Sequence, residues 1–229
     1  MVESSIEFPR PARYTWHVEK QTPLTSALNI DALANTVCQR SPYDHVIVPR
    51  FVKPEALPAI NFSYPKIPKP GSYPHHILKF GPAFAALLEE LRGVEMRQAV
   101  EKVFNLDLTN RPTTVTVRGQ CQQKDGRIHT DSVEKIITVL VYINQRWENS
   151  GGLLRVLRGD NNIENYAAEV PPVDGTLIAF RRGNNSWHGH KRYVGERRVL
   201  QLNWVTDERF ARREKGRHVL SAFLKRLKI

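Results

Sequence analysis

The hydrophobic residues of the first half of the chain recur at the spacing of helices, and those of the second half at the spacing of strands. Pro82 suits the first position of a helix, and Gly93 precedes a second helical pattern. A shorter helix is predicted from Ile30, with Ser26 or Asn29 as its cap. The apolar positions that predict these helices are Ile30, Leu33, Val37 and Cys38, then Phe84, Leu87, Leu88 and Leu91, and finally Val100, Val103 and Phe104. We expect these helices to brace one face of a β core that follows them.

Two other segments frame that core. Residues 53–74 contain six prolines, whose fixed φ angles and missing N–H donors predict an extended loop and exclude a sheet interior. The aromatic residues of this passage indicate an ordered loop, a candidate wall or lid of an active site. Residues 113–117 are β-branched and predict a strand that leads toward position 129.

The run His129-Thr130-Asp131 places an imidazole and a carboxylate two positions apart. Side chains two apart on a strand point to the same face, so both could bind one ion. His188 or His190, from a distant strand, could add a second imidazole. Two histidines and one carboxylate on one face leave the opposite coordination positions open, which is typical of non-haem Fe(II) oxygenases.

Further motifs follow His129 and Asp131 in order. They are residues 139–144, Trp147, residues 151–154, residues 172–175, residues 177–180, His188, Arg198 and Trp204. With these motifs, residues 115–205 resemble the 2-oxoglutarate and Fe(II)-dependent dioxygenases, in particular the prolyl-hydroxylase-like branch. The resemblance implies a mainly β fold with supporting helices, built on a double-stranded β-helix (jelly-roll, cupin-like) core.

The resemblance also implies the metal centre and its cofactors. Fe(II) would be bound by His129, Asp131 and His188, because the family pattern places the second histidine directly after the Ser186-Trp187 pair. His190 would then contact one of these ligands or face the substrate. The cosubstrate would be 2-oxoglutarate, with O2 as oxidant and ascorbate as a candidate stimulant.

The distal carboxylate of 2-oxoglutarate needs a buried cation, and a guanidinium pairs with a carboxylate in a two-pronged fork. Arg197 and Arg198 compete for this role. Arg198 alternates with the apolar residues Leu200 and Leu202, which predicts that it faces inward, whereas Arg197 would be solvated. The family spacing also selects Arg198, and by resemblance Tyr142 would contact the same carboxylate.

The length of 229 residues suits one β domain. We expect a single domain 1–229, with N-terminal helical and loop support over 1–112, the core over about 113–206 and a basic C-terminal helix over 207–229. Cys38 and Cys121 are too few for a disulfide framework. No apolar run is long enough to span a bilayer, and the residues after Met1 do not resemble a signal peptide, so a cytoplasmic location is expected.

The net charge is +11, and residues 206–229 carry eight basic residues against three acidic ones. Val219, Leu220, Phe223, Leu224 and Leu227 recur there at helical spacing. Such a basic amphipathic helix could contact a peripheral membrane surface, nucleic acid or an anionic substrate. Alternatively, its apolar stripe packs on the core and its charges are solvated.

These observations predict an enzyme, a 2-oxoglutarate-dependent dioxygenase that hydroxylates a protein side chain, an amino acid, or a sugar or glycan. Specificity in such folds lies in loops, so the substrate is not readable from the core motifs. Two alternatives stay open. One is a nucleobase dealkylase of the same fold, favoured by charge but without a sign of base-stacking motifs. The other is a non-catalytic basic binding module with a vestigial barrel.

Overall fold

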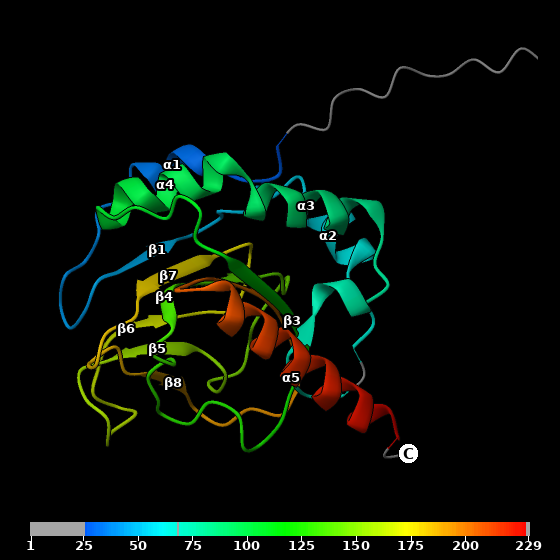
Figure 1. Cartoon of the computed structure of the whole chain (residues 1–229). Coiled ribbons are helices and arrows are strands. Elements are labelled where there is room, and N and C mark those ends of the chain that lie inside the picture. Colours follow the sequence, from blue (N-terminus) through cyan, green and yellow to red (C-terminus); the bar gives the residue numbers. More distant parts are fainter. Residues whose placement is uncertain (1–25, 68, 228–229) are drawn as a thin grey trace, which may run out of the picture.

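Two antiparallel β-sheets face each other in the computed structural model, which describes residues 26–67 and 69–227 (Figure 1). The larger sheet has the strand order β1-β7-β4-β9-β3-β2 and the smaller one the order β6-β5-β8. The larger sheet consists of β1 (His45–Val48), β2 (Tyr73–Pro74), β3 (Thr113–Cys121), β4 (Lys135–Tyr142), β7 (Leu177–Arg181) and β9 (Gly195–Val205). The smaller sheet consists of β5 (Leu154–Leu157), β6 (Tyr166–Val170) and β8 (His188–His190). The long strands β3, β4 and β9 are neighbours, and they form the middle of the molecule.

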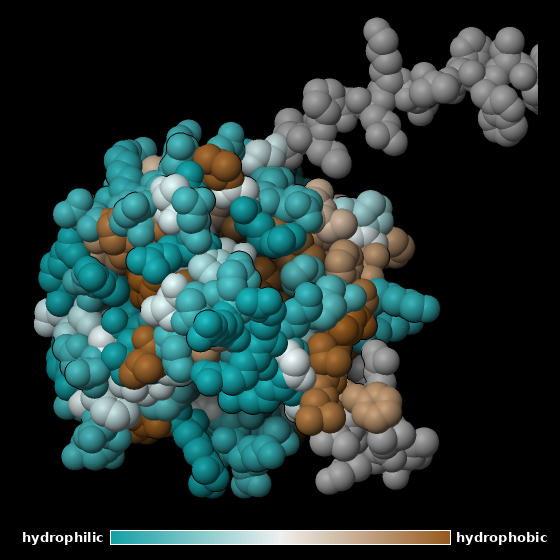
Figure 2. All heavy atoms as spheres, in the orientation of Figure 1, coloured by the Kyte–Doolittle hydropathy of each residue, from teal (hydrophilic) through white to brown (hydrophobic). Residues whose placement is uncertain are grey.

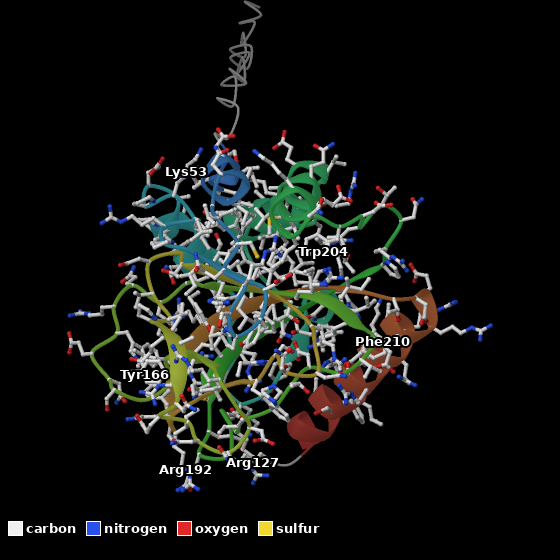
Figure 3. All side chains as sticks on the ribbon, turned by 90° about the vertical axis from the view of Figure 1, so that its left-hand side faces the viewer. Lys53, Arg127, Tyr166, Arg192, Trp204 and Phe210 are labelled. Carbon is white, nitrogen blue, oxygen red and sulfur yellow. The ribbon has the colours of Figure 1, made fainter. Side chains whose placement is uncertain are left out.

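Four helices cover the outer face of the larger sheet, as Figure 1 shows. They are α1 (Ile30–Ala34), α2 (Leu57–Ser63), α3 (Pro82–Arg92) and α4 (Val94–Phe104). The largest hydrophobic core lies between these helices and the sheet, and it includes Leu200, Leu202 and Trp204 of β9. Trp204 lies on the helix side of the sheet in Figure 3. The predicted starts of α3 and α4 and the cap of α1 by Asn29, whose side chain accepts a hydrogen bond from Ala32 N, are confirmed.

The sequence predictions for the N-terminal half were wrong in three places. Helix α1 ends at Ala34, and Val37, which was placed on its buried face, is 76% exposed. The proline-rich passage is not all loop, because α2 forms within it with a proline in its first turn, where a missing N–H breaks no helical hydrogen bond. The predicted N-terminal support also contributes β1 and β2 to the larger sheet. Residues 1–25 of that support lie outside the described residues.

The inner face of the larger sheet packs on the smaller sheet through a second, smaller cluster. Its members are Tyr43, Tyr142, Leu154, Val156, Val170, Ile178, Phe180 and Val199. This cluster fills only part of the space between the sheets. The inner face of β9 also carries Arg197, Gln201 and Asn203, which line a cavity.

The predicted C-terminal helix is α5 (Glu208–Leu227), which lies beside β2, β3 and β9 and crosses in front of β3 in Figure 1. It packs through Phe210, Ala211 and Ala222. Leu220 and Phe223 are exposed, so the alternative in which the whole apolar stripe packs on the core does not hold for these two residues. The side chains of Leu224 and Leu227 lie outside the described residues. Among the described residues, no helix combines the length and apolar character needed to cross a membrane.

Candidate metal centre and cosubstrate pocket

The backbone brings His129 opposite His188. The N–H of each residue donates to the carbonyl of the other, both at 3.0 Å, so the two residues form an isolated antiparallel bridge between distant parts of the chain. Asp131 follows two positions later. One ligand atom from each of His129, Asp131 and His188 lies within 4.8 Å of the other two. The structure therefore brings together the three residues that the sequence predicts as metal ligands.

Hydrogen bonds leave the same ring nitrogen of each histidine available. His129 Nδ1 lies 2.8 Å from the carbonyl oxygen of Arg127, and His188 Nδ1 lies 3.0 Å from that of Ser186. Because a carbonyl oxygen can only accept, each Nδ1 carries a hydrogen, so the nitrogen that can offer a lone pair to a metal is Nε2 in both rings. Burial, partly opposed by Asp131, lowers the pKa of His188 to about 4, so this imidazole is neutral at neutral pH.

Asp131 is held by two side chains of β4. Burial disfavours its charged form, but the Lys135 ammonium, His188 and the Thr138 hydroxyl outweigh that effect and hold its pKa at about 2. Lys135 Nζ lies 2.8 Å from Oδ1, and Thr138 Oγ1 donates to Oδ2 at 2.6 Å. The sequence interpretation missed both partners. For Thr138 the available signal was the alternation of β4, in which Thr138 and Tyr142 share the inward face.

His190 lies apart from the three candidate ligands. Its Nδ1 donates to the carbonyl of Lys191 at 2.7 Å, and its Nε2 lies 4.0 Å from the Cys121 sulfur. Burial and the nearby Arg197 lower its pKa to about 4. His190 lines the same cavity as the three residues, which agrees with its predicted place near them.

The structure contradicts the placement of the two arginines. Arg198 points to the outer side of the sheet, where it donates to Asn61 Oδ1 at 2.9 Å, lies 2.9 Å from a Glu196 carboxylate oxygen and packs over the ring of Tyr64. Arg197 lines the cavity with His129, Asp131 and His188. The alternation along β9 was assigned correctly, but its apolar face was taken as the face of the pocket. That face is instead the one that the helices cover.

Arg197 is a buried cation, 7% exposed, whose hydrogen bonds go only to neutral groups among the described residues. Its Nε donates to the carbonyl of Gly152 at 2.8 Å and one terminal nitrogen donates to the Tyr142 hydroxyl at 3.3 Å. In the described part of the chain no carboxylate lies within ion-pair distance of it. A buried charge normally has a partner, so this arrangement is suited to binding an anion.

The cavity has a volume of about 380 Å³, and its two ends lie at different levels of β4 and β9. Thr138 pairs with Asn203 beside the candidate metal ligands, and Tyr142 pairs with Val199 near Arg197. Four residues of strand separate Thr138 from Tyr142, or about 13 Å at roughly 3.3 Å per residue. Leu140 lines the cavity between these levels, and Val199 lines it at the level of Tyr142. A short dicarboxylate could therefore reach from the metal ligands to Arg197, with its methylene groups against apolar side chains.

Residues 118–206 match the family model described as the 2OG-Fe(II) oxygenase superfamily. This region is similar to that superfamily. The matched segment contains His129, Asp131, His188, Tyr142 and Arg197, and it ends before α5 begins. Enzymes of this family are oxidoreductases that use Fe(II), 2-oxoglutarate and O2, so the predicted family and cofactors are confirmed at that level.

Two solved structures are similar in fold. A prolyl 4-hydroxylase from Phytophthora capsici has a TM-score of 0.53 at 16% identity, with 82% of this chain and 68% of that chain covered. A truncated viral collagen prolyl hydroxylase from Paramecium Bursaria Chlorella virus-1 has a TM-score of 0.50 at 13% identity, with 76% and 94% covered. They confirm the predicted double-stranded β-helix fold. No curated protein matches this sequence.

Proposed function

We propose that the protein is an Fe(II)- and 2-oxoglutarate-dependent hydroxylase in which His129, Asp131 and His188 bind the metal. The observation that carries this proposal is the combination, in one cavity, of three convergent ligand side chains and a buried arginine that has no carboxylate partner among the described residues. Arg197, helped by Tyr142, binds the distal carboxylate of 2-oxoglutarate. The substrate is a protein side chain, an amino acid, or a sugar or glycan.

The donor set fits Fe(II). Two imidazoles whose Nδ1 atoms are hydrogen-bonded, so that Nε2 faces the site, and one ionised carboxylate make up the donor set that this ion takes in oxygenases. When bound, Fe(II) and 2-oxoglutarate would supply the electrons that activate O2, with one oxygen atom going to the succinate formed together with CO2 and the other to a C–H bond of the substrate. The chain itself positions these groups and keeps water away from them.

Each neighbouring residue then has a positioning task. Arg127 and Ser186 fix the histidine rings through their carbonyls, and Thr138 and Lys135 fix the Asp131 carboxylate. Leu140 and Val199 exclude water from the middle of the cavity. Tyr142 is fully buried, and burial raises the pKa of its hydroxyl, so it stays protonated and can donate a hydrogen bond to a carboxylate.

The test is metal binding followed by conversion of 2-oxoglutarate to succinate. The wild-type protein should bind one Mn(II), a redox-stable substitute for Fe(II), and should form succinate with Fe(II), ascorbate and O2. His129→Ala, Asp131→Ala and His188→Ala should abolish succinate formation, whereas His190→Ala should still bind the metal. Loss of the metal in His190→Ala with retention in His188→Ala would reassign the second histidine. No metal binding in the wild-type protein would favour the non-catalytic binding module.

A further inference from the structure

The candidate metal site occupies only part of its cavity, which continues toward α5. The far side is lined by Thr114 and Thr116 of β3 and by Glu214, Arg217 and His218 of α5. All five residues lie outside the segment that matches the family. This part of the cavity therefore lies beyond the candidate metal ligands and is enclosed partly by elements outside the matched segment.

The far side is hydrophilic. Its floor is a hydrogen-bonded row in which Gln201 Nε2 donates to Asn203 Oδ1 and Asn203 Nδ2 donates to Thr114 Oγ1, both at 3.0 Å. On α5, Arg217 and His218 both contact the Glu214 carboxylate, at 2.7 Å and 3.0 Å. Among the described lining residues the only Phe, Tyr or Trp is Phe180, which packs on His188. A flat base or an apolar side chain finds no aromatic platform here, which disfavours a nucleobase substrate.

The carboxylates that line this cavity are all paired with cations, whereas two cations at its rim are not paired with a carboxylate of the described residues. Each of its three carboxylates already has a cationic partner: Asp125 with Arg118, Asp131 with Lys135, and Glu214 with Arg217, all within 2.8 Å. Lys124 and Arg127 have no carboxylate within ion-pair distance in the described part of the chain. They lie at the rim of the cavity, next to the metal ligand His129.

A well-defined turn holds these two cations in place. Asp125 Oδ2 accepts from the Gln122 N–H at 3.1 Å and from Arg118 at 2.8 Å, which closes the turn. Gly126 has a φ of +84°, and a Cβ there would lie 2.4 Å from His190 Nδ1, so only glycine fits against that histidine. The positions of Lys124 and Arg127 are therefore set by the same packing that shapes the active site.

The cationic surface continues on the other side of the turn. A neighbouring groove of about 960 Å³ shares Lys124 and Arg127 with the cavity and adds Arg192, a third cation without a carboxylate partner among the described residues. Arg127 and Arg192 extend from the same edge of the molecule in Figure 3. Figure 2 also shows a largely hydrophilic surface around the front of α5.

Building on the proposed function, we propose that the substrate is a hydrophilic molecule with an anionic group, a carboxylate or a phosphate. This group binds Lys124 and Arg127 at the rim, and the polar part of the molecule lies between the turn and α5. The ion pairs of the cavity support this assignment. Arg197 binds the cosubstrate, whereas Lys124 and Arg127 have no carboxylate partner among the described residues and can bind a second anion. Exposed cations near a low-dielectric cavity also attract anions from solution.

The test uses inorganic phosphate as probe, with acetate in parallel. Binding to the metal-free protein is followed at low ionic strength by line broadening of the phosphate 31P signal. The protein loaded with Mn(II) and 2-oxoglutarate is then used to measure how strongly the paramagnetic Mn(II) enhances the nuclear relaxation of the bound anion. This enhancement reports the distance between the anion and the metal. Wild-type protein should bind at least one of the two anions and show strong, saturable relaxation.

The decisive variant is Lys124→Gln/Arg127→Gln, with Lys53→Gln/Lys102→Gln as matched control. The control removes the same charge from a distant surface, since Lys53 lies at the opposite end of the molecule from Arg127 in Figure 3. The first variant should weaken anion binding about five- to tenfold, and the control should stay near wild type. Equal effects of both variants, or no relaxation of either anion in the wild-type protein, would overturn the proposal.

The same samples separate this proposal from the proposed function. Mn(II) and 2-oxoglutarate affinities, measured by calorimetry, should be the same in the wild-type protein and the Lys53→Gln/Lys102→Gln control. If Mn(II) does not bind at all, the proposed function fails, and line broadening in the metal-free proteins still decides whether Lys124 and Arg127 bind the anion.

Discussion

Strand β9 has two buried faces with opposite chemistry. On the outer face Leu200, Leu202 and Trp204 pack against the helices and belong to the main hydrophobic core. On the inner face Arg197, Gln201 and Asn203 alternate with them and line the cavity. Both faces are hidden from bulk water, although only the outer one is built from residues that favour burial.

The difference shows that the inside of this barrel is not its most apolar surface. The outer face stabilises the fold by removing apolar area from water. The inner face can carry polar and charged side chains because they bond one another and because a charged ligand can complete the set. Single substitutions at neighbouring positions of β9 can therefore show which face contributes to the stability of the fold and which contributes to ligand binding.

The largest expected effect distinguishes Arg197 from Arg198. Arg197→Ala should reduce 2-oxoglutarate affinity by at least about 100-fold, because leaving a buried charge unpaired costs about 3–5 kcal/mol. Arg198→Ala should change it by less than about threefold, because its partners Glu196 and Asn61 lie on the outer side. Calorimetric titration of the Mn(II)-loaded variants measures both values. A larger effect of Arg198→Ala would return the anchor to the outer face.

The next comparison is between Leu202 and Gln201. Leu202→Ala should lower the free energy of unfolding by about 2–5 kcal/mol, since it leaves a cavity under the helices. Gln201→Ala removes one hydrogen bond in an open cavity and should cost less than about 1.5 kcal/mol. Urea unfolding followed by tryptophan fluorescence gives both numbers. Similar losses at the two positions would mean that both faces contribute equally to stability.

The smallest expected effect concerns α5, which covers the polar side of the cavity. Its Glu214 has a pKa held at about 2, below its ordinary value of 4.5, by hydrogen bonds from His218 and Arg217. Because the pKa is lower in the folded state, the ionised carboxylate stabilises the protein above about pH 4.5, and this stabilisation is lost as pH falls toward 2.

Glu214→Gln should therefore destabilise the protein at pH 7 by less than about 1 kcal/mol, and the difference from wild type should shrink as pH falls from 4.5 toward 2. Unfolding free energies at several pH values test this. A difference that stays constant down to pH 2, or grows, would show that the carboxylate charge is not what holds Arg217 and His218.

Much of the fold and of the metal centre could be predicted from the sequence. Local rules were enough for α3 and α4, because Pro82, Gly93 and helical spacing act within a few residues. The ordered motifs between 115 and 205 were enough for the fold and for the group His129, Asp131 and His188. Alternation along β9 was also readable, so it was clear that Arg197 and Arg198 point to opposite sides.

Tertiary structure alone decided which of those sides holds the pocket. Alternation separates two faces but does not say what covers each, and here helices from residues 30–104 cover the apolar one while the smaller sheet and α5 enclose the other. The same holds for Arg217 at the cavity and for the exposed Leu220. Each depends on contacts between segments far apart in the chain, which local patterns of polarity do not encode.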